Sequence, residues 1–220
     1  MVKIAIAGDV HGHFDLLFEK ASALGADLIL QLGDTGMFPD PSQVDAATSR
    51  HGACQEFLPY LQGDKPVPIP TWVIKGNHED FEYLDFVKKN GGVIAPNLRY
   101  VANGSVIELE GIRFGMLGGN YSPRYFYEEE PKQQRRRHFT MGETDALKVA
   151  GFDVLLLHDG PENPTLRKGS PVLTEFIKET EPSRVYHGHF HQPYHSSIGK
   201  TEIISLGHIA YPGENIVLYE

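Results

Sequence analysis

Short apolar runs alternate with amphipathic stretches along most of the chain. A short apolar run between turn residues is typical of a buried strand, and apolar residues that recur every three or four positions predict a helix. Strands are therefore expected at residues 2–7, 28–32, 71–74, 154–157 and 184–186. Helices are expected at residues 14–24, 54–61, 79–89, 142–150 and 171–180. This alternation of strand and helix predicts an α/β fold.

A second pattern, in which apolar and polar residues alternate with a period of two, marks the middle and the end of the chain. Residues 105–109 and 112–116 flank Glu110-Gly111 and predict a β-hairpin. Residues 195–198, 201–205 and 215–218 predict a β-rich meander. The expected architecture is a four-layer αββα sandwich of two mixed β-sheets flanked by helices, with functional side chains gathered at the carboxyl ends of the strands.

The size and composition of the chain fit this architecture. A length of 220 residues suits one domain, and the two loops expected at 38–50 and 120–138 do not resemble domain linkers, so 1–220 is expected to be a single domain. No apolar stretch approaches the roughly 20 residues of a membrane span. The first apolar run is too short for a signal peptide, which predicts a cytoplasmic protein.

Charge and cysteine content narrow the function. The formal net charge of −9 opposes binding to long duplex nucleic acid, because such proteins neutralise many phosphates with Lys and Arg. A smaller phosphate ester remains compatible, since bound metal ions supply local positive charge. Cys54 is the only cysteine, so any metal must be held by nitrogen and oxygen ligands.

Residues of the kind that bind metals follow apolar runs at five places. In chain order these are Asp9-Val10-His11, Gly33-Asp34, Gly76-Asn77-His78-Glu79, His158-Asp159 and Gly188-His189-Phe190-His191. Each alone reads as a helix cap, a turn or an ordinary loop histidine. Together they predict a hydrolytic centre with two divalent cations about 4 Å apart, the arrangement that activates water against phosphate esters.

The order of these segments resembles that of the calcineurin-like metallophosphoesterases over nearly the whole chain. The resemblance implies that Asp9, His11 and His191 hold one cation and that Asp34 bridges the pair. The second cation is implied to lie with the remaining ligands, which are Asn77, His158 and His189. Imidazole and oxygen ligands suit Mn, Fe or Zn, with Mn favoured, and the two cations would turn a bridging water into hydroxide near neutral pH.

The same resemblance assigns the proton transfer. His78 follows the ligand Asn77 and is implied to be a general acid that protonates the leaving oxygen. Glu79 is expected to orient the His78 imidazole.

Two branches of this family compete for the substrate. The phosphoprotein phosphatases share the first and third motifs, but they carry an Arg in the second motif where this chain has Thr35-Gly36-Met37-Phe38. The catalytic domain of RNA lariat debranching enzymes is more similar, and it hydrolyses 2′,5′ phosphodiester bonds. That similarity lies in stretches beyond the ligands themselves: Arg50-His51 through Gln55-Glu56-Phe57, Gly63-Asp64-Lys65, residues 91–100, Gly111–Gly115 and His158-Asp159-Gly160-Pro161. One departure is Asp9, where the eukaryotic debranching enzymes usually have Cys.

The resemblance also suggests how substrate is recognised. The 120–138 loop stands where debranching enzymes insert a loop that reads the branched nucleotide. Its candidate contacts are the base-stacking Tyr121, Tyr125 and Tyr127 and the phosphate-binding Arg124 and Arg135. Alternatively the loop is a lid whose arginines pair with residues 128–130. His13 either lines the pocket or neighbours the cap of the first helix, and His51, His187, His195 and His208 are not expected to be ligands.

The function expected is a dinuclear-metal-dependent phosphodiesterase that acts on nucleotides or on short single-stranded or branched RNA, 2′,5′ linkages included. A phosphomonoesterase acting on phosphoproteins or nucleotides is the alternative within the family. A non-catalytic metal-binding scaffold is the alternative from another class, although it has no chemical need for His78 and the full ligand set.

Overall fold

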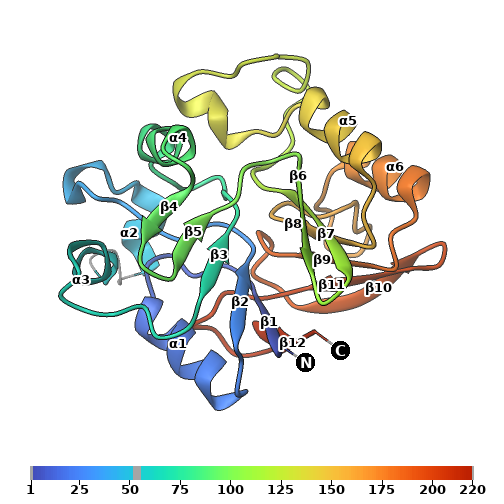
Figure 1. Cartoon of the computed structure of the whole chain (residues 1–220). Coiled ribbons are helices and arrows are strands. Elements are labelled where there is room, and N and C mark those ends of the chain that lie inside the picture. Colours follow the sequence, from blue (N-terminus) through green and yellow to red (C-terminus); the bar gives the residue numbers. More distant parts are fainter. Residues whose placement is uncertain (1, 52–55, 220) are drawn as a thin grey trace.

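The computed structural model describes residues 2–51 and 56–219, and in that part of the chain two β-sheets lie face to face with helices on both outer sides (Figure 1). The sheets have the strand orders β12-β1-β2-β3-β5-β4 and β10-β11-β9-β8-β7-β6. The strands are β1 (Ile4–Ala7), β2 (Leu28–Gln31), β3 (Thr71–Val73), β4 (Val93–Ala95), β5 (Leu98–Tyr100), β6 (Ser105–Leu109), β7 (Ile112–Leu117), β8 (Val154–Leu157), β9 (Arg184–His187), β10 (Tyr194–Ile198), β11 (Thr201–Ser205) and β12 (Ile216–Leu218). The four-layer αββα sandwich is confirmed.

Helices cover the outer faces of both sheets. The α-helices are α1 (Phe14–Ala23), α2 (Ala46–His51), α3 (Phe57–Gln62), α4 (Phe81–Lys89), α5 (Met141–Ala150) and α6 (Pro171–Thr180), and the 3₁₀ helices are η1 (Pro41–Gln43) and η2 (Gln133–Arg137). The first four α-helices lie beside the first sheet and α5 and α6 beside the second (Figure 1). No helix among the described residues is long and apolar enough to cross a membrane.

Both sheets are parallel in the middle and antiparallel at their edges. In the first sheet β1, β2, β3 and β5 run parallel, and β12 and β4 pair antiparallel at the two edges. In the second sheet β11, β9, β8 and β7 run parallel between the antiparallel β10 and β6. Parallel neighbours end at the same edge of a sheet, so the loops after β1, β2, β3, β8 and β9 can meet.

Side chains that alternate along the strands build three apolar layers. Ile4 and Ile6 of β1 pack between the two sheets, whereas Ala5 and Ala7 face the helices of the first sheet. The same alternation places Leu155 of β8 against α5 and α6 and its neighbours between the sheets. A period of two in a strand buried on both faces gives this separation, because successive side chains point to opposite faces.

Two expected segments differ from the prediction. The loop expected at 38–50 contains η1 and most of α2, and Asp40 begins η1 by accepting a hydrogen bond from the Ser42 N–H at 2.9 Å. The residues around Pro41 are mostly polar, so these short helices show no apolar periodicity in the sequence. The helix expected at 54–61 appears as α3, displaced towards the C-terminus, and residues 54 and 55 of that prediction lie outside the described residues.

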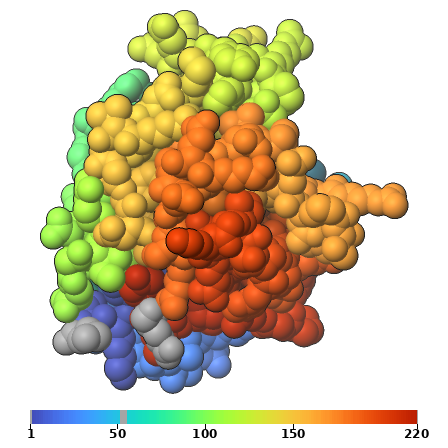
Figure 2. All heavy atoms as spheres, turned by 90° about the vertical axis from the view of Figure 1, so that its right-hand side faces the viewer, coloured from blue at the N-terminus to red at the C-terminus, as the bar shows by residue number. Residues whose placement is uncertain are grey.

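The edges of the first sheet were also missed in part. The hairpin of β4 and β5 was not predicted, because strands of three residues are too short to show a period. The expected meander is a hairpin only in β10 and β11, since β12 crosses to the first sheet and pairs with β1. The segment 120–138 stands above the body of the molecule, between β7 and α5, and Figure 2 shows its yellow-green part projecting at the top.

Candidate dimetal site

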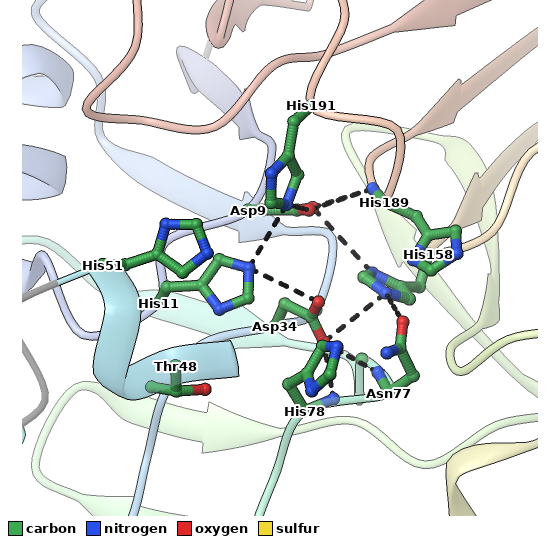
Figure 3. A network of polar contacts seen from close by, with 12 residues as sticks. Asp9, His11, Asp34, Thr48, His51, Asn77, His78, His158, His189 and His191 are labelled. Carbon is green, nitrogen blue, oxygen red and sulfur yellow. Dashed lines mark hydrogen bonds and ion pairs between the residues drawn. The ribbon is translucent and has the colours of Figure 1, made fainter. Parts of the chain in front are cut away.

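The predicted ligands converge where the strands end. Asp9 follows β1, Asp34 follows β2, and Asn77 follows β3 across a short loop. His158 comes directly after β8, and the loop after β9 carries His189 and His191. Figure 3 shows these side chains, together with His11, pointing towards one another from both sheets. The tertiary structure therefore brings together every residue that the sequence predicted as a metal ligand.

The backbone of this site is strained, and glycines make room for its carboxylates. His11, Asp34, His189 and His191 all have positive φ, between 44° and 64°, a conformation that residues with a side chain rarely adopt. A Cβ at Gly76 would stand 2.0 Å from Asp34 Oδ1. Strain of this kind persists where the surrounding structure enforces it and is frequent at functional sites.

One group of ligands contains Asp9, His11, Asp34 and His191. His191 Nε2 lies 2.7 Å from Asp9 Oδ2 and 3.3 Å from His11 Nε2. His11 Nε2 is 3.5 Å from Asp34 Oδ2. One ligand atom from each of the four residues lies within 4.8 Å of the others, which is the spacing of a cation site.

A second group contains Asp34 again, with His158 and His189, and Asn77 adjoins it. His158 Nε2 is 2.9 Å from Asn77 Oδ1 and 3.5 Å from Asp34 Oδ1. The other ring nitrogen of His158 donates to the Leu32 carbonyl at 2.9 Å, which turns Nε2 towards the group. Because Asp34 offers one oxygen to each group, it stands in the position of a bridging ligand.

The charges of the site fit cations. Burial is the largest influence on Asp9 and Asp34 and would raise the pKa of each, yet the surrounding histidines outweigh it and hold both pKa values below the usual range. Burial lowers the pKa of His11 to about 4, so this ring is neutral at pH 7. Two buried carboxylates and several imidazoles, with no thiolate among them, make the donor set that Mn, Fe or Zn accepts. The residues present therefore fit a pair of divalent cations.

His78 lies at the rim of this site and is held by a residue that the sequence did not single out. Its ring is 5.9 Å from that of His11, and its Nδ1 lies 2.7 Å from Asp45 Oδ2. The hydrogen bond to Asp45 and the charge of Asp34 overcome the effect of burial and raise the pKa of His78. Asp45 precedes α2 in a segment expected to be a plain loop, so no sequence signal pointed to it.

The expected contact between Glu79 and His78 is wrong. The Glu79 carboxylate accepts from the Thr35 N–H and hydroxyl at 2.8 and 2.7 Å and from the Gly76 N–H at 3.2 Å. Burial and the charge of Asp34 raise the pKa of Glu79 to about 7. Glu79 thus links the loop after β2 to the loop after β3 by hydrogen bonds. The carboxylate that contacts His78 is that of Asp45, in the position expected for Glu79.

The candidate substrate contacts of the 120–138 segment divide into packed and exposed side chains. Tyr121 packs on Phe126 and Phe139, so its ring belongs to the apolar layer of the second sheet. Arg135 forms an ion pair with Glu128 at 2.9 Å, as the lid alternative expected. The other candidates lie on or near the surface: Arg124 and Tyr127 are exposed, and Tyr125 is half-buried with the guanidinium groups of Arg124 and Arg135 5.4 and 5.2 Å from its ring centre.

Two histidines without an expected role also adjoin the site. His51 stacks on His11 at 4.2 Å, and His208 stacks on His51 at 4.5 Å. One ring nitrogen from each of His11, His51 and His208 lies within 4.8 Å of the other two, yet His208 Nδ1 accepts from the Ala210 N–H at 3.1 Å. A neutral His208 then carries its proton on Nε2, which leaves no lone pair for a metal. His13 occupies the N-cap of α1 and contacts the His51 carbonyl at 2.8 Å.

Comparison with known proteins agrees with this geometry. A lariat debranching enzyme of Danio rerio is 27% identical over 229 residues, which cover 86% of this chain and 40% of that protein. The Saccharomyces cerevisiae enzyme is 24% identical and covers 90% and 58%, and the Homo sapiens enzyme is 26% identical and covers 86% and 42%. The chain thus spans roughly half the length of the curated relatives it matches.

Solved structures share the fold at low sequence identity. A protein of Thermus thermophilus, TT1561, superposes with a TM-score of 0.64 at 19% identity, over 95% of this chain and 90% of that one. A dimetal phosphatase of Danio rerio superposes with a TM-score of 0.59 at 12% identity, over 94% and 88%. The sequence model of the calcineurin-like phosphoesterases matches residues 2–193. The chain therefore belongs to the calcineurin-like phosphoesterase family.

Proposed function

We propose that this chain, as a single domain, is a dinuclear-metal-dependent phosphodiesterase that hydrolyses nucleotide or short RNA phosphodiester bonds, with 2′,5′ linkages among its substrates. The observation that carries the proposal is the placement of His78, with its carboxylate partner Asp45, beside two ligand groups that share Asp34. A protonated imidazole at the rim of such a centre is what the departure of an alkoxide requires.

Each part of the site has a defined task in this proposal. Two divalent cations would neutralise the phosphoryl oxygens and lower the pKa of a water placed for in-line attack. One cation would be held by Asp9, His11 and His191. The other would be held by Asn77, His158 and His189, and Asp34 would bind both. His78 donates its Nε2 proton to the leaving oxygen, while Asp45 accepts from Nδ1, keeps the ring oriented and favours its charged form.

The relatives support a diester over a monoester. These relatives are lariat debranching enzymes, and the similarity to them extends over 81 to 90% of this chain. The exposed Arg124 and Tyr127 and the half-buried Tyr125 stand on the 120–138 segment, where they can meet the part of a substrate that extends beyond the phosphate. Arg135 could bind a phosphate only after breaking its ion pair with Glu128. Tyr121 packs on Phe126 and is not assigned a contact with substrate.

The proposal is tested by Mn²⁺-dependent hydrolysis of three substrates side by side: a phosphomonoester, a 3′,5′-linked dinucleotide and a 2′,5′-linked dinucleotide. The chain should hydrolyse both dinucleotides and should cleave the 2′,5′ linkage at least as well as the 3′,5′ linkage. The control is His78→Ala, which should retain both cations and lose about 10²- to 10⁴-fold in kcat.

The other outcomes separate the alternatives. Turnover of the monoester alone would establish a phosphatase and make the 120–138 segment a lid. Two bound cations without turnover of any substrate would establish a scaffold. Normal activity of His78→Ala would refute the role given to His78.

A further inference from the structure

Three rings from distant parts of the chain form a wall next to the candidate dimetal site. These are His51 at the end of α2, and His208 and Tyr211 between β11 and β12; together they are called the ring wall. His208 stacks on His51 at 4.5 Å and on Tyr211 at 4.3 Å, with interplanar angles of 24° and 23°, and the ring centres of His51 and Tyr211 are 5.9 Å apart. The Tyr211 hydroxyl and His51 Nδ1 are 3.0 Å apart.

The ring wall stands on one side of the metal ligands and the 120–138 segment on the other. His51 and Tyr211 adjoin the first ligand group, with ring centres 4.2 Å from His11 and 6.1 Å from His191. The 120–138 segment adjoins the second group, because the Tyr121 N–H donates to Asp159, the neighbour of His158, at 3.0 Å. A phosphodiester bound between the groups would therefore extend one substituent towards each side.

Tyr211 is both accessible and firmly held. It is 44% exposed, although His208 covers one face of its ring. Its N–H donates to the His208 carbonyl at 2.9 Å, and its carbonyl accepts from the Asn215 side chain at 2.9 Å. The turn is tied to the metal site itself, since the Ile209 N–H donates to the Asp9 carbonyl at 2.8 Å. An aromatic ring fixed in this way loses little conformational entropy when a flat ligand stacks on it.

We propose that the ring wall is a nucleobase subsite, in which the base of the nucleoside on the His191 side of the scissile phosphate stacks on the free face of Tyr211. This inference rests on the proposed phosphodiesterase function. A base is joined to its phosphate through one sugar, so a ring one side chain away from the ligands is within its reach. Stacking suits any base, because every base has a π-face. The exposed Tyr127 and the half-buried Tyr125 of the 120–138 segment would then contact the other nucleoside.

The first test compares intact and abasic substrates. The Mn²⁺-loaded chain is given dinucleoside monophosphates of one linkage, either intact or lacking the base at one end or the other. Loss of the base that stacks on Tyr211 should lower kcat/KM by roughly 5- to 150-fold, the range for one base stacked on an aromatic side chain. In Tyr211→Leu the ratio of kcat/KM for the intact substrate to kcat/KM for the abasic one should fall towards one. Tyr211→Phe keeps the ring and should preserve the ratio of the unmodified chain.

The second test measures binding without turnover. A dinucleotide carrying 2-aminopurine is titrated into His78→Ala protein loaded with Mg²⁺, and stacking is followed as quenching of its fluorescence. Adding Tyr211→Leu should raise the Kd by the same roughly 5- to 150-fold, and adding Tyr211→Phe should leave it close to that of His78→Ala.

The outcomes distinguish the subsite from the enzyme function. If no diester is hydrolysed but binding depends on the Tyr211 ring, the proposed function fails and the subsite stands. An intact-to-abasic ratio of one at both ends in the unmodified chain would overturn the subsite, whether or not the variants fold. So would a Kd unchanged by Tyr211→Leu, or a loss of kcat/KM equal for intact and abasic substrates, since that loss would be purely structural.

Discussion

Replacing Asp45 with Asn tests the most specific feature of the site, the carboxylate that holds His78. Asp45→Asn keeps the shape of the side chain and removes its charge. Asp45 Oδ2 lies 2.7 Å from His78 Nδ1, and the side chains of Asp45 and His78 are 35% and 29% exposed. A hydrogen bond to a charged group contributes about 1.5 to 3 kcal/mol, and solvent at this exposure reduces that to roughly 1 to 2 kcal/mol. The variant should therefore lose roughly 5- to 30-fold in kcat, since each 1.4 kcal/mol corresponds to about tenfold in rate.

The pH dependence of the same variant has a definite sign. His78 must be protonated to act as an acid, so kcat falls as the pH rises through its pKa. Burial opposes the charged ring, but the hydrogen bond to Asp45 and the charge of Asp34 raise its pKa. Removing the Asp45 charge lowers the pKa of His78, and the alkaline limb of the kcat profile should move to lower pH.

Steady-state kinetics from pH 5 to 10 on the best dinucleotide would measure both effects. Asp40→Asn is the matched control, because Asp40 is an exposed carboxylate of the same segment that bonds only to Ser42 in the described structure. In a His78→Ala background Asp45→Asn should add almost nothing, since the two residues act as a unit. A kcat within about twofold of the unmodified protein, with an unshifted alkaline limb, would refute the reasoning.

Three further predictions address the metals, the 120–138 segment and the core. Asp34→Asn should lower bound Mn²⁺ from about two ions per chain to about one or fewer, measured by inductively coupled plasma mass spectrometry, because both ligand groups share this carboxylate; two retained ions would contradict a bridging position. Lys75→Met should speed hydrogen exchange in 120–138, because the buried Lys75 ammonium donates to two carbonyls of that segment at 2.8 and 3.0 Å; unchanged exchange would show that this tie is dispensable. Leu156→Ala, between the sheets, should lower the free energy of unfolding in urea by about 3 kcal/mol, and the exposed Val149→Ala by less than about 0.5 kcal/mol; equal effects would place the core elsewhere.

The sequence by itself determined the layers of the fold and the residues that meet as candidate metal ligands. Apolar runs such as the one before Asp9 identify strands buried on both faces, and parallel strands end at a common edge. A polar residue at the end of each run is therefore enough to predict that Asp9 and Asp34 meet, whereas His158 follows a strand of the second sheet and reaches them because the two sheets pack face to face. The order of the motifs along the chain also indicates the family, because that order can be read from the sequence alone.

Only the tertiary structure decided which residues serve those ligands. Asp45 lies 33 positions from His78, and α2 brings it there by packing that no local pattern records. Glu79 was expected beside His78 because it follows it in sequence, but its buried carboxylate turns to Thr35 instead.

The ring wall shows the same limit over a longer range. His51 and Tyr211 are 160 positions apart, and their contact depends on β12 crossing back to pair with β1. Short-range periodicity reflects which face of an element is buried, whereas contacts between loops depend on how whole elements pack, and a single sequence carries no local signal for that.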